Sequence, residues 1–146
     1  MIGELRLRLG VKEGRTVIRD VYNRVPLKIA KPFYLEPESG EIFIYQMNPA
    51  GGMVQGDDYQ QYVELEPGAK AFLTTQSATR VYRTPDGFAQ QGNYFTLGKG
   101  AALEFFPDPV IPFAGSRFIG ETEVHLTSLS PGARRQLSQR INFPSQ

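Results

Sequence analysis

The stretch Leu65-Glu66-Pro67-Gly68-Ala69 returns 32 residues later as Leu97-Gly98-Lys99-Gly100-Ala101, and again as Leu129-Ser130-Pro131-Gly132-Ala133. Each copy places a glycine at a turn, and a strand-like run of residues precedes each turn. The first two copies are followed by a second apolar run, at 69–75 and 101–106. A fixed period of this size, with a strand on each side of the turn, is typical of stacked β-layers as in a solenoid.

The remainder of the chain has the same strand-like character. Residues 3–9 alternate leucine with charged side chains, which is the period-two pattern of a half-buried strand. Residues 15–23 are rich in β-branched and aromatic residues and form the expected partner strand of a hairpin, and 41–47 and 59–66 are further strands. We therefore predict an all-β, β-helix-like layered architecture with few or no helices. A plain β-sandwich with similar hairpins is the alternative.

The composition excludes several classes of function. The 146 residues include 16 basic and 15 acidic side chains, and a net charge of +1 does not favour binding to nucleic acid or to an acidic membrane. The chain has no cysteine and a single histidine, His125, which excludes disulfides, thiolate metal sites and thiol nucleophiles. There is neither a long apolar run nor a secretory signal, so we expect a cytoplasmic protein.

The first distinctive loop carries Gly51, Gly52 and Gly56, which allow backbone conformations with positive φ. Their spacing fits neither a Walker loop nor the dinucleotide-binding fingerprint. Asp57 and Asp58 follow, and adjacent carboxylates on an extended chain point to opposite sides. At a glycine-rich bend one or both would line a polar passage and bind divalent ions weakly. A turn aspartate that accepts bonds from backbone donors is the alternative.

The segment Leu103–Ser116 is apolar and rigid, with three prolines and the carboxylates Glu104 and Asp108. Proline fixes φ and removes a backbone donor, so this segment is not a helix or a central strand throughout. The repeat predicts that Leu103 and Phe105 are core residues. An acid–base pair of Glu104 and Asp108 is conceivable, but nothing fixes their separation, and no nucleophile-elbow pattern is present. The residues favour a binding or scaffold role over an enzyme.

Four sets of residues then form a longer pattern. In chain order they are Arg24-Val25-Pro26-Leu27 with Lys31-Pro32-Phe33-Tyr34; Asn48-Pro49-x-Gly51-Gly52-x-Val54-x-Gly56-Asp57; Pro67-Gly68-Ala69 with Thr74-Thr75-Gln76-Ser77-Ala78-Thr79-Arg80-Val81-Tyr82-Arg83; and Gly100-Ala101-x-Leu103-Glu104 running into Pro107-Asp108-Pro109-x-Ile111-Pro112-Phe113-x-Gly115-Ser116-Arg117-Phe118. Together they resemble the family of the urease accessory protein UreD, called UreH in some organisms. The resemblance covers roughly residues 3–127 in the family's order.

The resemblance implies a β-helix-like scaffold that is not an enzyme and has no tightly bound cofactor. Such proteins form a complex with UreF and the GTPase UreG, which delivers nickel, and this complex docks on urease apoprotein. They are thought to relay nickel transiently through an internal tunnel. The resemblance maps the acidic bend linked to that tunnel onto Asp57 and Asp58, and an acidic position after the second turn onto Glu104.

The resemblance also assigns roles to structural and contact residues. The structural turns are Gly51, Gly52, Gly56, Gly68 and Gly100. We expect the segment between residues 107 and 113 to be mainly a rigid structural element, with a secondary role in contacting UreF or urease. The residues of that expected contact are Pro107, Asp108, Pro109, Ile111, Pro112 and Phe113.

Family members are longer, so this chain resembles their N-terminal half. We expect a UreD-like β domain at 1–127 and a divergent tail at 128–146, where Arg134–Arg140 replaces the apolar strand expected of a third repeat. A truncated β-helix exposes an edge, which predicts poor solubility and impaired activity.

The alternative function is a β-rich ligand-binding module without catalytic activity, for example for carbohydrate. It predicts an exposed aromatic platform built from Tyr59, Tyr62 and Tyr94.

Overall fold

The computed structural model describes residues 1–127 and 134–142, and these are mostly β-strand. The strands are β1 (Ile2–Lys12), β2 (Arg15–Arg24), β3 (Lys28–Ile29), β4 (Ile42–Met47), β5 (Asp58–Leu65), β6 (Lys70–Thr75), β7 (Thr79–Val81), β8 (Ala89–Leu97), β9 (Ala102–Phe106), β10 (Val110–Pro112), β11 (Arg117–Leu126) and β12 (Arg134–Asn142). A 3-10 turn at Pro37–Ser39 is the one helical element of the described residues. The prediction of an all-β chain with few or no helices is confirmed.

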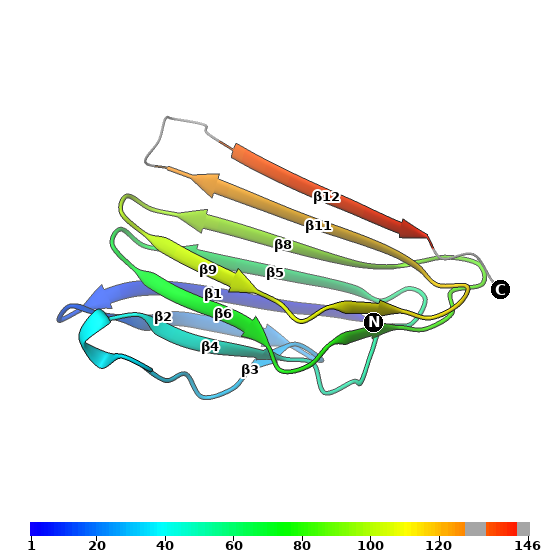
Figure 1. Ribbon diagram of the computed structural model, residues 1–146, viewed down its shortest axis with the longest axis horizontal. Coiled ribbons are helices and arrows are strands. Elements are labelled where there is room, and N and C mark those ends of the chain that lie inside the picture. Colours follow the sequence, from blue (N-terminus) through cyan, green and yellow to red (C-terminus); the bar gives the residue numbers. More distant parts are fainter. Residues whose placement is uncertain (128–133, 143–146) are drawn as a thin grey trace.

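The strands form three sheets, and the chain visits them in rotation. Sheet A has the order β12-β11-β8-β5-β1-β2, sheet B the order β3-β4-β6-β9, and sheet C pairs β10 with β7. One coil runs β5, β6, β7 and the next runs β8, β9, β10, each strand lying parallel to its counterpart. Figure 1 shows β5, β8 and β11 pointing one way, with β6 and β9 pointing the opposite way in a second layer. This is a layered solenoid and not a β-sandwich of hairpins.

The register of the coils follows the sequence repeat for the first two copies. Leu65 pairs with Leu97, which is the predicted offset of 32 residues. The third copy was assigned the wrong offset, because Leu97 pairs with Leu126 and not with Leu129. The predicted turn around Gly132 lies outside the described residues.

A shorter return between sheets C and A explains the changed offset. Val81 pairs with Pro112, and Ala89 pairs with Phe118. The second coil therefore returns from position 81 to 89, whereas the third returns from 112 to 118 and loses two residues there. Loops absorb such deletions because few packing contacts depend on their length. The repeat of the strands is retained while the spacing of the turns is not.

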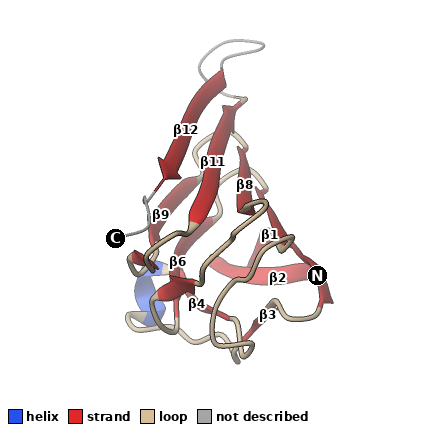
Figure 2. Cartoon of the chain, turned by 90° about the vertical axis from the view of Figure 1, so that its right-hand side faces the viewer, coloured by secondary structure: helices blue, strands red, loops and turns tan. Residues whose placement is uncertain are grey.

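Sheet A has antiparallel strands at both of its edges. β1 lies parallel to β5 but forms a hairpin with β2, as the sequence predicts. At the other edge β12 pairs antiparallel with β11, so the chain folds back on sheet A there and does not enter sheet B. Figure 2 shows β11 and β12 side by side at the top of the molecule.

The core lies between sheets A and B and is built from the inward residues of alternating strands. Leu5, Leu7 and Leu9 of β1 are buried, and so are Ile42 and Ile44 of β4 on the facing wall. Leu103 and Phe105, predicted as core residues, face the same interior and pack against this cluster while remaining only partly buried. Burial of such side chains, about 25 cal/mol for each Å² of apolar surface, is the main stabilising term.

The glycine-rich bend packs closely against the second coil. Gly51, Gly56, Gly68 and Gly100 have φ values between 70° and 85°, the left-handed region that glycine adopts most readily. Gly52 has a different reason to be glycine. A Cβ atom there would lie 2.6 Å from the ring of Tyr82 and 2.8 Å from the carbonyl oxygen of Arg80.

We expect Gly52→Ala to lower the free energy of unfolding by about 3 kcal/mol, because the added methyl group meets backbone that is held in place. Met53 donates to the carbonyl of Arg80 at 2.7 Å, so this strand cannot move aside without losing a bond. Gly51→Ala is the matched control, since no atom lies within 4 Å of its added Cβ. It should cost only about 1 kcal/mol of backbone strain. Urea unfolding of both variants measures the difference, and equal losses would contradict the packing argument.

Candidate functional site

The interior of the solenoid changes from apolar to polar along the strands of sheet A. One row of inward residues is Leu9, Leu65, Leu97 and Leu126, which are register partners across four strands. Four residues nearer the start of each strand, the corresponding row is Leu5, Gln61, Asn93 and Thr122. Asn93 donates to the hydroxyl of Thr122 at 3.3 Å, so this row is joined by side-chain bonds. One end of the core is therefore hydrocarbon and the other is lined by amides and hydroxyls.

The facing wall, sheet B, changes in the same place. Along β4 the inward residues Ile42 and Ile44 are followed by Gln46, and along β6 Leu73 is followed by Thr75. Gln46 and Thr75 are register partners. Polar side chains from both sheets thus face each other across one end of the interior.

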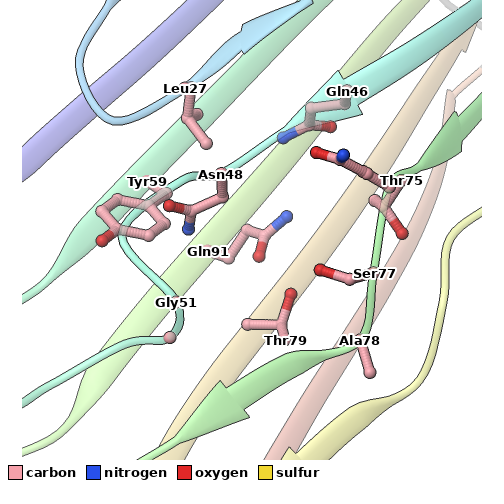
Figure 3. A pocket seen from close by; sticks show the side chains of 12 residues that line it. Leu27, Gln46, Asn48, Gly51, Tyr59, Thr75, Ser77, Ala78, Thr79 and Gln91 are labelled. Carbon is pink, nitrogen blue, oxygen red and sulfur yellow. The ribbon is translucent and has the colours of Figure 1, made fainter.

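Two connected cavities occupy this polar end. The smaller has a volume of about 40 Å³ and the larger about 300 Å³. Both are lined by Thr75, Thr79 and Gln91, so they adjoin each other. Figure 3 shows Gln46, Asn48, Ser77 and other polar side chains around the smaller cavity, drawn from strands on opposite walls. A polar space therefore runs through the interior.

Several buried polar atoms in this region have no hydrogen-bond partner among the described residues. They are Oε1 of Gln46 and both side-chain atoms of Gln61, whose residue is fully buried. A buried polar atom without a partner costs about 1 to 3 kcal/mol. Folding alone does not account for two such amides in a β-core, whereas a polar guest in the interior would.

Asp57 lies where the glycine-rich bend enters β5 and is only 5% exposed. Its Oδ1 accepts a bond at 2.9 Å from the amino group of Met1, and its Oδ2 accepts bonds from the backbone N–H of Val54 at 2.9 Å and the hydroxyl of Tyr59 at 3.2 Å. This is the capping arrangement that the sequence left open as an alternative. The carboxylate already has three donors, so a metal ion would have to displace at least one of them.

Tyr59 connects the bend to the interior. Its ring lines the smaller cavity, while its hydroxyl bonds to Asp57, which lines a surface hollow of about 350 Å³ together with Asp58. Burial, followed by the negative charge of Asp57, raises the pKa of Tyr59 to about 12. The tyrosine is thus a neutral hydrogen-bond donor between the outer hollow and the inner cavity.

The raised pKa predicts a loss of stability in alkali. Below pH 10, the ordinary tyrosine pKa, the folded and unfolded chains both hold the proton and the contribution is complete. Between pH 10 and about 12 the unfolded tyrosine ionises while folded Tyr59 does not, so the free energy of unfolding falls as pH rises. Tyr59→Phe should flatten this decline in urea unfolding curves measured across the window. An unchanged slope in Tyr59→Phe would contradict the assignment.

The three carboxylates predicted to relay metal do not form one cluster. Asp58 is half-buried at the start of β5 and accepts a bond from the side-chain amide of Gln60. Glu104 lies on β9 with its side chain exposed on the outer face of sheet B, and its charge, after burial, raises the pKa of Glu41. Within the described residues no group of three histidine, cysteine or acidic side chains is placed to hold a metal ion.

The segment predicted as a partner contact lies at the outer coil. Ile111 and Phe113 are exposed, and β10 within the segment pairs only with β7 of sheet C. Asp108 is different, because it lines the larger cavity and is bonded twice to Thr75: its N–H donates at 2.8 Å and its Oδ2 accepts at 3.1 Å. The structure thus places Asp108, and not Glu104, at the polar interior.

The aromatic platform of the alternative function is not assembled as expected. Tyr59 is buried at 2% exposure, on the opposite face of β5 from Tyr62. Tyr62 and Tyr94 stack on each other at 5.0 Å, and the guanidinium of Arg6 lies 5.1 Å above the Tyr62 ring. The ring faces that a sugar would stack on are therefore largely covered by neighbouring side chains.

Comparison with known proteins adds a family to this geometry. The family model described as UreD urease accessory protein matches residues 1–138. The chain belongs to the UreD family. The curated urease accessory protein UreD of Acetivibrio thermocellus is 42% identical over 122 residues, which are 84% of this chain and 46% of that protein. UreD 2 of Streptomyces griseus is 37% identical over 133 residues, covering 90% of this chain and 44% of that protein.

This UreD-family chain spans about half the length of the curated relatives that it matches. The resemblance seen in the sequence, to the family's N-terminal half, is thereby confirmed. The relatives are named accessory proteins and not enzymes. Among the helical residues that the structure describes, none forms a helix long and apolar enough to cross a membrane.

The sequence did not single out the neutral polar residues of the UreD interior, although a signal for them exists. Gln61 and Asn93 occupy inward positions of strands whose other inward residues are mostly apolar. A polar residue at the buried phase of a period-two strand is unusual and requires an explanation. Counting the phase of β5 and β8 would have found both, whereas a search for charged residues does not.

Proposed function

We propose that this chain acts in the cytoplasm as a urease maturation scaffold that passes nickel through its polar interior and performs no catalysis. The observation that carries the proposal is the row of amides and hydroxyls on both walls of the solenoid, in a chain of the UreD family. Amide, hydroxyl and carboxylate oxygens bind divalent ions weakly and exchangeably, which suits transit better than storage.

The proposed path begins at the outer hollow lined by Asp57 and Asp58 and passes Tyr59 into the smaller cavity. It continues into the larger cavity, where Asp108 supplies a carboxylate. Glu104 lies outside this path, so any contact it makes with nickel would be on the outer face of sheet B. Nickel is cargo in this proposal, and no resident cofactor is needed.

The proposed partners are UreF and UreG homologues and urease apoprotein. Support comes from the exposed residues of the segment at 107–113, above all Ile111 and Phe113, at 44% and 42% exposure. Exposed apolar side chains beside a rigid proline-rich backbone lose little entropy on binding. Docking there would place a partner next to the larger cavity and its Asp108.

The test uses the whole 146-residue chain in cells that lack their own UreD but express UreF, UreG and urease. We expect the tagged chain to co-purify with UreF and UreG and to restore part of the urease activity. In equilibrium dialysis with Ni²⁺, Asp58→Ala should weaken binding by about tenfold. Asp20→Ala, an exposed carboxylate of β2, is the control and should bind Ni²⁺ as the parent chain does. Absence of all three partners from the purified material would overturn the scaffold role, and unchanged Ni²⁺ binding would remove Asp58 from the path.

A further inference from the structure

Sheet B ends at an open strand. β9 is the last strand in the order β3-β4-β6-β9, and β10 pairs on one side only, with β7. Sheet A is different, because β11 and then β12 continue beyond β8. Among the described residues, therefore, two of the three sheets stop at the third coil while the first sheet extends past it.

The inward side chains of the open strand are less buried than their counterparts one coil earlier. Ala71 and Leu73 of β6 are each 1% exposed. Their register partners on β9 are Leu103 and Phe105, which face the same interior but remain partly buried. Phe105 also lines the larger cavity, which opens at this end. The missing contacts are those that one more coil would make.

The backbone of β9 is also prepared for another strand. Ala102 donates its N–H to the carbonyl of Ala69 on the β6 side at 2.9 Å. Successive residues of a strand direct their polar groups to alternate sides, so Leu103 and Phe105 direct theirs toward the open side. A row of such groups is a template for strand addition.

Stacked aromatic rings on the outer face of sheet B lead to the same edge. Phe43 stacks on Phe72 at 5.0 Å, and Phe72 stacks on Phe106 at 5.7 Å, one ring for each of β4, β6 and β9. Phe106 is the last ring and is 61% exposed. A further strand with an outward aromatic residue would continue the stack and cover it.

We infer that the edge formed by β9 and β10 binds one more coil of the same kind, supplied by the part of the UreD chain that the curated relatives have beyond the matched residues. The occupant is an extended segment that adds parallel to β9. It brings apolar side chains inward against Leu103 and Phe105 and an aromatic side chain outward against Phe106. The relatives provide the required length, since the matched residues are only 46% and 44% of the first two.

β12 limits which strands of such a segment can bind. It occupies the outer side of β11 and so takes the position in sheet A where a further coil would return. Sheets B and C remain available, so the segment binds first through its sheet-B and sheet-C strands. Full closure of the coil requires β12 to give way.

The test co-expresses the 146-residue chain with the part of the Acetivibrio thermocellus relative that lies beyond the matched residues, as a separate tagged polypeptide. We expect a one-to-one complex in which amide exchange at Leu103 and Phe105 slows by at least about tenfold. Phe106→Lys should abolish or strongly weaken the complex. Tyr45→Lys is the matched control, because Tyr45 is an exposed aromatic residue at 40% on β4, away from the edge, and it should bind normally.

Three results would overturn the inference: no complex between the two soluble polypeptides, a complex equally sensitive to Phe106→Lys and Tyr45→Lys, or protection confined to residues outside β9 and β10. Formation of a dimer of the 146-residue chain, protected at the same amides and unaffected by the added polypeptide, would also overturn it. That outcome would identify a second copy as the occupant.

Discussion

Replacing Asp57 with alanine is expected to lower the free energy of unfolding by about 3 kcal/mol. The change leaves the amino group of Met1, the N–H of Val54 and the hydroxyl of Tyr59 without their shared acceptor. Removing one partner from a buried ion pair costs about 3 to 5 kcal/mol, and hydrogen bonds to charged groups contribute about 1.5 to 3 kcal/mol each. Because the amino group is itself exposed, we expect a loss near the lower end of the ion-pair range.

Asp58→Ala provides the matched control for this prediction. Asp58 has the same side chain one position along the chain but is half-buried, and the bond printed for its carboxylate comes from Gln60 on the same strand. We expect it to change stability by less than about 0.5 kcal/mol. Urea unfolding of the two variants measures the difference. If Asp57→Ala is as mild as Asp58→Ala, the anchoring role of Asp57 is wrong.

Replacing Gln61 with leucine is expected to have the opposite sign and to raise the free energy of unfolding by about 2 kcal/mol. Gln61 is fully buried, and both polar atoms of its side chain lack a partner among the described residues. Replacing an unpaired buried amide by an apolar group of similar size removes a penalty of about 1 to 3 kcal/mol. Its register partner Leu5 shows that leucine fits this row of the interior.

Gln60→Leu is the control on the opposite face of the same strand. Gln60 is half-buried and bonded to Asp58, so this substitution should be neutral or destabilising. Thermal or urea unfolding compares the two. A loss of stability in Gln61→Leu would show that the amide is paired in the folded protein, which would contradict an interior that keeps polar groups at the expense of stability.

Much of the fold follows from local pattern in the sequence. The alternation of Leu5, Leu7 and Leu9 predicted β1, and the repeat of the Pro/Gly turn predicted the stacking of β5 on β8 with its offset. The third offset was not predictable in this way, because the shortened return before Phe118 depends on how loops close between sheets. The antiparallel pairing of β12 was also missed, since the sequence predicted a strand that continues the layer.

The candidate site was predicted less completely than the fold. The bend at Asp57 and Asp58 drew attention because charged residues beside glycines are conspicuous. Their different surroundings depend on contacts distant in sequence, such as the one between Asp57 and Met1. Glu104 and Asp108 were considered together, yet strand phase places one outside sheet B and the other at the cavity. Which side of a proline-rich segment faces inward is decided by packing and cannot be read from composition.

The most direct test of a polar path for nickel is the nickel content of urease purified from cells in which this chain is the sole UreD-type protein. The parent chain should raise nickel per urease active site above that of cells without it. Gln91→Leu, which makes the shared wall of both cavities apolar, should bring the content back to that lower level. Thr96→Val, on the outer face of the same strand, should load urease as the parent chain does. Full nickel loading with a stably folded Gln91→Leu chain would contradict transit through the interior.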